Sequence, residues 1–237
     1  MDEVEGLPPP VNIAEVVNKY EVKRYGDKFQ QALNKARGKK ILIVQVLGNY
    51  QQGKTSTISL ITGNSQHEIG NGFKEQTKGV WIDGPYTIQY IANRFGIPGF
   101  DNIPDDNAIF FIDCEGAGGF NLPTAEQNNN LMRSLDIPYS SVASCVLYPV
   151  NLNESIQSIE NVASILNFKN FSTEIEPNFS ESLVLIPLYK NVIRLGSIGG
   201  TYEKPTENLY KRFGRALEDL WAERNLMDTK YNICPRP

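Results

Sequence analysis

The sequence predicts an α/β fold in which a mostly parallel central sheet is flanked by helices in a three-layer sandwich. Two observations lead to this prediction. Short, apolar, β-branched runs recur along the chain, and segments with apolar residues at helical spacing lie between them. Because parallel strands need crossover connections, this alternation indicates strand–helix–strand units that share one sheet. A chain of 237 residues is long enough for one such domain.

The strands are expected where apolar residues run together. The first run is nearly all apolar and β-branched, which is typical of a strand that is covered on both faces. Gly79 to Ile91 alternates between polar and apolar residues and predicts a further strand, at an edge of the sheet. The apolar runs of strand length cover residues 41–47, 108–112, 142–150 and 183–188.

The helices are expected before and between these runs. Residues 1–25 have an acidic, proline-rich start and are expected to lead into a single domain that covers residues 26–237. Residues 96–107 contain glycine and proline breakers and three aspartates, which predicts an exposed insertion. Helical spacing is found in residues 26–37, 58–61, 124–135, 156–166 and 206–227.

Composition excludes several classes of function. Lys plus Arg number 23 and Asp plus Glu number 27, so a net charge of -4 gives no general attraction for nucleic acid. No apolar run approaches the ~20 residues of a membrane span, and a signal peptide is not evident, so we expect a cytoplasmic protein. Three cysteines and one histidine, His67, are too few for a disulfide framework or a four-ligand zinc site. His67 itself is expected to be exposed in a polar loop.

A phosphate-binding motif follows the first apolar run directly. The segment Gly48-Asn49-Tyr50-Gln51-Gln52-Gly53-Lys54-Thr55 matches G-x-x-x-x-G-K-[ST] at every position and leads into a helix. Glycines let backbone N–H groups point at phosphate oxygens, and the start of the helix adds partial positive charge. Lys54 is expected to reach the β- and γ-phosphates, and the Thr55 hydroxyl is expected to ligate Mg²⁺. The motif therefore predicts the fold of a P-loop nucleoside triphosphatase, with nucleotide-binding residues Gly48, Asn49, Tyr50, Gln51, Gln52, Gly53, Lys54, Thr55 and Ser56.

A carboxylate is expected beside this loop. The apolar run at residues 108–112 ends at Asp113, so this side chain emerges at the carboxyl edge of the sheet, where open α/β folds bind ligands. Its spacing to Gly116 gives D-x-x-G, in which the glycine N–H can approach a γ-phosphate and sense its loss. Asp113 is therefore predicted to contribute to the Mg²⁺ site, and Gly116 to the nucleotide site.

Three segments, in order, resemble the large G domain of the guanylate-binding protein and atlastin families. They are the phosphate loop with its aromatic Tyr50, Gln76-Thr77-Lys78-Gly79-Val80-Trp81, and Asp113-Cys114-Glu115-Gly116. Thr77 follows Thr55 by 22 residues, about the separation found in the families. The resemblance implies a GTPase that binds GTP, GDP and Mg²⁺ and forms a nucleotide-dependent homodimer through its G-domain face. It also implies that Thr77 closes onto Mg²⁺ and the γ-phosphate, with catalysis assigned to Gln51, Lys54, Thr77 and Glu115.

The chain departs from these families at two positions. Gln51 stands where they usually carry an arginine finger, and a neutral amide cannot supply that charge. We therefore expect slow intrinsic turnover, or an arginine from elsewhere such as Arg94 or Arg133. Lys190 and Asn191 stand where a base-reading R-D motif is expected, and Asn191 offers only a carbonyl to the guanine hydrogens. Guanine preference is therefore implied by the resemblance and not by these residues.

Two function classes remain open on the sequence. The first is a Mg²⁺-dependent GTPase that hydrolyses GTP to GDP, and whose segments around Thr77 and Gly116 respond to the γ-phosphate. The alternative is a nucleotide-binding module with little or no hydrolysis that acts through a partner. A kinase would need an arginine-rich lid, for which the sequence has no obvious cluster. Tyr50 and Trp81 are expected to be packing residues.

Overall fold

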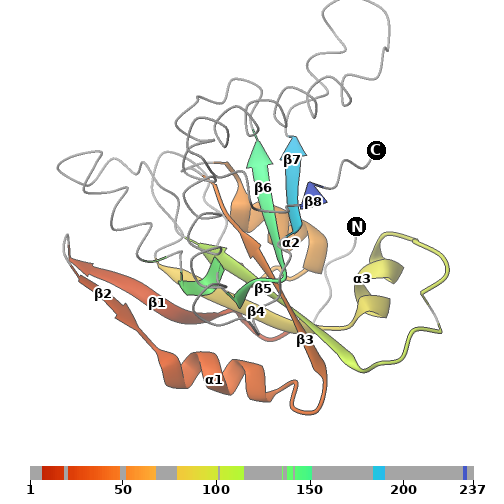
Figure 1. Ribbon diagram of the computed structural model, residues 1–237, viewed down its shortest axis with the longest axis horizontal. Coiled ribbons are helices and arrows are strands. Elements are labelled where there is room, and N and C mark those ends of the chain that lie inside the picture. The colour runs from red at the N-terminus through yellow and green to blue at the C-terminus, as the bar shows by residue number, and fades with distance from the viewer. Residues whose placement is uncertain are drawn as a thin grey trace, which may run out of the picture.

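The computed structural model describes residues 7–18, 21–48, 52–67, 79–100, 102–114, 135, 138–140, 142–150, 184–189 and 232–233. Figure 1 shows how the helices and strands are arranged. Their order is β1 (Val11–Asn18), β2 (Glu21–Arg24), α1 (Gly26–Asn34), β3 (Lys40–Val46), α2 (Lys54–Thr62), β4 (Val80–Tyr86), α3 (Ile88–Arg94), β5 (Asn107–Cys114), β6 (Cys145–Val150), β7 (Val184–Tyr189) and β8 (Asn232–Ile233).

One sheet contains all of the described strands, in the order β2-β1-β4-β5-β3-β6-β7-β8. The strands β5, β3, β6, β7 and β8 are parallel to one another, whereas β4, β1 and β2 pair antiparallel at the other side of β5. β3 lies between β5 and β6, so the loop that follows β3 starts near the middle of the carboxyl edge. The predicted mostly parallel sheet is confirmed.

The two faces of the sheet carry different helices, as neighbouring residues of β5 illustrate. Phe110 packs in a buried cluster with Ala32 of α1, and Phe111 packs in a second cluster with Ile58 of α2. Successive side chains of a strand point to opposite faces, so these clusters are two cores separated by the sheet. The fold is therefore the three-layer α/β sandwich of P-loop nucleoside triphosphatases, as the sequence predicts.

The sheet begins earlier in the chain than expected. β1 and β2 lie within residues 1–25, which we expected to be only a lead-in, and β1 pairs with β4 through Asn12 and Trp81. The strand pattern is hard to recognise in the sequence because the register of β1 shifts twice, between Asn12 and Ala14 and between Val16 and Asn18. These irregularities break the period of two, so that Ile13 and Ala14 are both buried.

The segment Gly79 to Ile91 is not one strand. β4 ends at Tyr86, and α3 begins at Ile88 after Thr87, whose hydroxyl accepts a hydrogen bond from the Tyr90 N–H at 3.0 Å. A threonine at this position caps a helix by satisfying one of its first free N–H groups. β4 also lies between β1 and β5, so our prediction of an edge strand was wrong.

Most other predicted elements lie where the sequence indicates. Residues 96–107 form an insertion whose described residues are largely exposed. The strand expected at residues 142–150 starts later, at Cys145. The helices expected at residues 124–135, 156–166 and 206–227 fall outside the described residues, except for the buried Leu135. In the part of the chain that the structure describes, no helix has both the length and the apolar character needed to cross a membrane.

The contact between Gly79 and β1 gives a first prediction. Gly79 has a φ of +80°, and a Cβ there would lie 2.0 Å from the backbone oxygen of Ala14. We expect Gly79→Ala to destabilise the protein by at least about 2 kcal/mol, because it combines a strained backbone with a clash against a neighbouring strand. Urea unfolding measures the change.

Gly99→Ala is the matched control for this variant. Gly99 also has a positive φ, of +90°, but no atom lies within 4 Å of a Cβ placed there. Only the backbone cost remains, so this variant should lose roughly 1 kcal/mol. Equal losses in the two variants would mean that the approach of β1 to Gly79 contributes nothing.

Candidate nucleotide-binding site

The junction between β3 and α2 has the backbone geometry that the glycines of the motif require. Gly53 caps the start of α2 in the left-handed conformation, with a φ of 68°. Gly48 has a φ of 151°, and a Cβ there would lie 2.2 Å from Oε1 of the buried Gln52 side chain. A side chain is therefore disfavoured at both glycines of the loop.

Lys54, Thr55 and Asp113 are brought together at the carboxyl edge of the sheet. Asp113 lies directly opposite Val46, the last residue of β3, in the parallel pairing of β3 and β5. The Thr55 hydroxyl donates a hydrogen bond to Asp113 Oδ2 at 2.6 Å. Lys54, the first residue of α2, is only 6% exposed. The strand pairing thus connects two motifs that are 58 residues apart in the chain.

The Asp113 carboxyl group is held in an unusual environment. Burial raises its pKa, while the hydrogen bond from Thr55 and the charges of Lys54 and His67 act in the opposite direction. Its second oxygen, Oδ1, is buried and has no hydrogen-bond partner among the described residues. A buried carboxylate oxygen without a donor is costly, so this atom is suited to accept a ligand from outside the chain.

The donor set fits Mg²⁺. Magnesium takes hard oxygen ligands, and it is usually held by one or two protein groups together with phosphate oxygens and water. The Thr55 hydroxyl and the Asp113 carboxylate supply such groups beside the phosphate loop. In the described ranges no group of three or more His, Cys, Asp or Glu side chains gathers at a possible metal site.

The remaining predicted site residues divide into two groups. Gln52 is buried, and Ser56 is half-buried in the first turn of α2. The others remain predictions because they lie outside the described residues: Asn49, Tyr50, Gln51, Thr77, Glu115, Gly116, Lys190 and Asn191.

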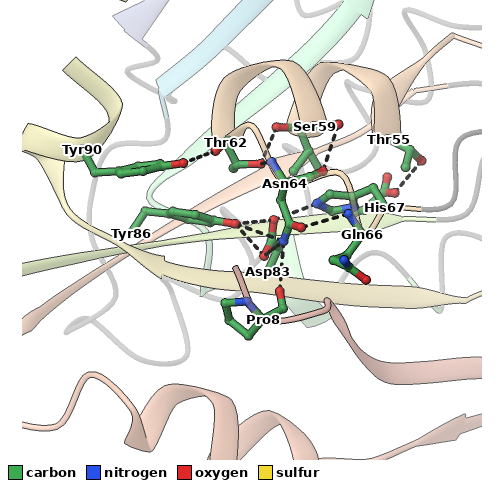
Figure 2. Close-up of polar contacts among 12 residues, drawn as sticks. Pro8, Thr55, Ser59, Thr62, Asn64, Gln66, His67, Asp83, Tyr86 and Tyr90 are labelled. Atoms are coloured by element: carbon green, nitrogen blue, oxygen red, sulfur yellow. Dashed lines mark hydrogen bonds and ion pairs between the residues drawn. The ribbon is translucent and has the colours of Figure 1, made fainter. Parts of the chain in front are cut away.

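Sequence reasoning missed a buried polar cluster next to this site, which Figure 2 shows. The Asp83 cluster consists of Asn64, His67, Asp83 and Tyr86. The His67 Nε2 atom lies 2.7 Å from Asp83 Oδ2, and the Tyr86 hydroxyl lies 2.8 Å from each oxygen of Asp83. Asn64 Nδ2 donates to Asp83 Oδ1 at 3.1 Å and to the Pro8 carbonyl at 3.0 Å.

The expectation that His67 is exposed was therefore wrong. His67 is 8% exposed, because the loop after α2 folds back onto β4. The contacts of Asn64 and His67 with Asp83 and Tyr86 span 16 to 22 residues, so no short sequence pattern predicts them. The sequence signal that could have indicated the cluster is Asp83 itself, because it stands inside an otherwise mostly apolar strand. A carboxylate at such a position is costly to bury without hydrogen-bond partners.

Arg94 lies far from where an arginine finger is needed. Its Nη2 atom donates to the Leu60 carbonyl at 3.4 Å, and a Cβ placed on Gly63 would lie 2.1 Å from its Nη1 atom. Both contacts are at the carboxyl end of α2, whereas the phosphate loop is at its amino end. Arg94 is thus excluded as the finger in this conformation, and Arg133 lies outside the described residues.

Comparisons with known proteins find similar solved structures but no matching family model or curated protein. The solved structures that match include the G domain of the FeoB iron transporter from T. maritima. That match is 16% identical, covers 73% of this chain and 83% of that chain, and has a TM-score of 0.40. The fold assignment rests on the sheet order and the β3–α2 junction, and the narrower resemblance to guanylate-binding proteins and atlastins stays a prediction.

The environment of Asp113 predicts a pH-dependent gain of stability in Asp113→Asn. A carboxyl group whose pKa is raised by folding destabilises the folded state once pH exceeds its unfolded pKa of about 3.9. Asparagine carries no charge and can still accept the Thr55 hydrogen bond. Without nucleotide or Mg²⁺, the variant should therefore unfold at a higher temperature than the parent at neutral pH.

The advantage of this variant should disappear in acid, where Asp113 of the parent is protonated. Thermal unfolding between about pH 3 and pH 8 tests the sign. Asp105→Asn is the control, because Asp105 is exposed and pairs with Lys39 at the surface. If Asp113→Asn is less stable than the parent at neutral pH, burial is not the dominant influence on the pKa of the Asp113 carboxyl group.

Proposed function

We propose that this protein is a Mg²⁺-dependent P-loop nucleoside triphosphatase that hydrolyses GTP to GDP in the cytoplasm. The observation that supports this proposal is the hydrogen bond between Thr55 and Asp113 beside the buried Lys54. It joins the two halves of a phosphate and metal site that the sequence motifs predict independently. The contact uses a hydroxyl from the start of a helix and a carboxylate from the end of a neighbouring strand.

Each of these residues has a defined role in the proposal. Lys54 neutralises charge on the β- and γ-phosphates, together with the N–H groups of the phosphate loop and of the first turn of α2. Thr55 and Asp113 hold Mg²⁺. When bound, the metal ion offsets the charge that develops on the phosphate oxygens during transfer. Burial strengthens all of these interactions, because the surroundings are less polarisable than water.

We assign the response to nucleotide to residues that the sequence motifs predict. Thr77 is proposed to contact Mg²⁺ and the γ-phosphate, Gly116 to sense the γ-phosphate, and Glu115 to orient the attacking water. Lys190 and Asn191 follow β7 directly, and β7 is parallel to β6, which is parallel to β3. β7 therefore ends at the edge of the sheet where the phosphate loop begins, which supports a role beside the base for the residues that follow it.

A binding module without useful turnover is the second candidate. Gln51 favours it, because the position carries no charge and Arg94 cannot provide one from the carboxyl end of α2. In that case nucleotide binding would control a partner, or would control association of two copies through the nucleotide face. The two candidates share the same site and differ only in phosphate release.

One experiment separates these possibilities. Binding of GDP, GTP, ADP and ATP is measured with Mg²⁺, and phosphate release is followed in the same samples. The proposal expects guanine nucleotides to bind more tightly than adenine nucleotides, with slow release of phosphate from GTP. Tight binding without release would favour the binding module, and failure of all four nucleotides to bind would refute both candidates.

Lys54→Ala tests the phosphate site. Nucleotide affinity should fall by at least about a hundredfold, because a buried charge-assisted contact to phosphate contributes roughly 3 kcal/mol. Calorimetric titration with GDP and Mg²⁺ measures the loss. Lys40→Ala should bind as the parent does, because the Lys40 side chain is 78% exposed and pairs with Asp106 at the surface.

Gln51→Arg tests whether turnover is limited by the missing charge. An arginine at this position would stabilise the charge on the transferring phosphoryl group, so phosphate release at saturating GTP should rise by about tenfold or more. Gln51→Lys is a useful comparison, because it adds charge without the planar fork of arginine. Molecular mass in solution is measured alongside, since face-to-face dimers would form with triphosphate. If neither variant is faster than the parent, the site lacks another catalytic element.

A further inference from the structure

Two buried carboxylates lie on the same face of the sheet. Asp83 of β4 is directly opposite Phe111 of β5, and Asp113 is two residues beyond Phe111. Asp83 and Asp113 are therefore diagonal neighbours on adjacent strands, a relationship that places Cα atoms about 7–8 Å apart. They are 3% and 2% exposed.

The two carboxylates differ in their hydrogen-bond partners. Both oxygens of Asp83 contact donor groups of Asn64, His67 or Tyr86 at 2.7–3.1 Å. Asp113 accepts one hydrogen bond, from Thr55, and its Oδ1 atom has no partner among the described residues. Asp83 is thus occupied, in that donors of the chain contact both of its oxygens. Asp113 is open, in that one of its oxygens has no donor among the described residues.

Tyr86 and Asn64 have few hydrogens to donate to Asp83. Burial and the charge of Asp83 raise the pKa of Tyr86, so its hydroxyl stays protonated and has one hydrogen to donate to two oxygens. Asn64 Nδ2 divides its donors among Asp83, Tyr86 and the Pro8 carbonyl. His67 supplies the shortest contact to Asp83, and it also favours the ionised form of Asp113.

We propose that His67 is a positioning residue of the cation site. It holds Asp83 in the Asp83 cluster and thereby keeps Asp113 as the one open carboxylate on this face, within the part of the chain that the structure describes. The metal ion is then directed to the edge of the sheet beside Thr55 and the phosphates, and away from the interior. The inference rests on the proposed function, because it assumes that Thr55 and Asp113 hold a divalent cation.

Mn²⁺ alone is the probe, with electron paramagnetic resonance to count free and bound ions in the whole protein without nucleotide. His67→Leu removes the shortest hydrogen bond to Asp83 and makes its Oδ2 atom more available on the face that it shares with Asp113. We expect the affinity for Mn²⁺ to rise by about tenfold or more, because an Asp83 oxygen that has lost its shortest hydrogen bond can serve as a second carboxylate ligand on the same face. The titration is done near pH 8, where protons compete least with the metal.

Two further variants give the controls. Asp83→Asn should leave the Mn²⁺ affinity of the parent unchanged, because Asp83 is occupied there. The double variant His67→Leu/Asp83→Asn should return the affinity to the parent value, because the second carboxylate is no longer present. If His67 has a purely structural role, His67→Leu should lower thermal stability without raising Mn²⁺ affinity. The double variant should then show the same loss of stability.

Several outcomes would overturn the inference. They are an unchanged or lower Mn²⁺ affinity in folded His67→Leu, a loss of affinity in Asp83→Asn, or a double variant that does not return to the parent value. If His67→Leu does not fold, Asp83→Asn still decides, because any loss of Mn²⁺ affinity there contradicts the proposal. The titration contains no nucleotide, so failure of GTP to bind would refute the proposed function without altering this result.

Discussion

The parallel pairing of β3 with β5 is the interaction on which the candidate site depends. Its register puts Asp113 opposite Val46, and therefore beside the start of the phosphate loop. A shift by one residue would turn the carboxylate to the opposite face, among the apolar side chains that pack against α1. The apolar residues of β5 prevent such a shift, because Phe110 and Phe111 each belong to a different core. Packing on both faces thus determines where the charged group stands.

The site illustrates a conflict between stability and binding. Asp113, Asp83, Lys54 and His67 are all buried, and each would be unfavourable without a partner. The protein meets this cost in two ways. Around Asp83 it supplies donors from several elements, whereas at Asp113 it leaves one oxygen without a partner among the described residues. A bound ligand can offset the unfavourable burial of the Asp113 oxygen, which no described residue of the folded protein offsets.

Much of the fold could be predicted because its signals are local. The apolar run of β3, the phosphate motif and the apolar run that ends at Asp113 predict a carboxylate beside the phosphate loop, and in the structure Thr55 contacts Asp113 there. β1 escaped prediction because its register shifts disturb the alternation of a strand, and α3 escaped because a single threonine cap marks its start. The Asp83 cluster escaped because it joins β4 to the loop after α2. Contacts of this kind depend on how elements pack, and that information is not contained in any short window of sequence.

The central position of β3 has a consequence for the order in which the molecule assembles. Its partners are distant in the chain, since Val46 pairs with Asp113 on one side and with Leu147 on the other. Contacts between such distant segments require large loops to close, which makes folding slow compared with that of a protein built from local contacts. The phosphate loop can therefore meet its carboxylate only after β5 has been synthesised and has paired with β3. A chain still emerging during synthesis would have the complete loop but not the complete site, so nucleotide could stabilise only the finished domain.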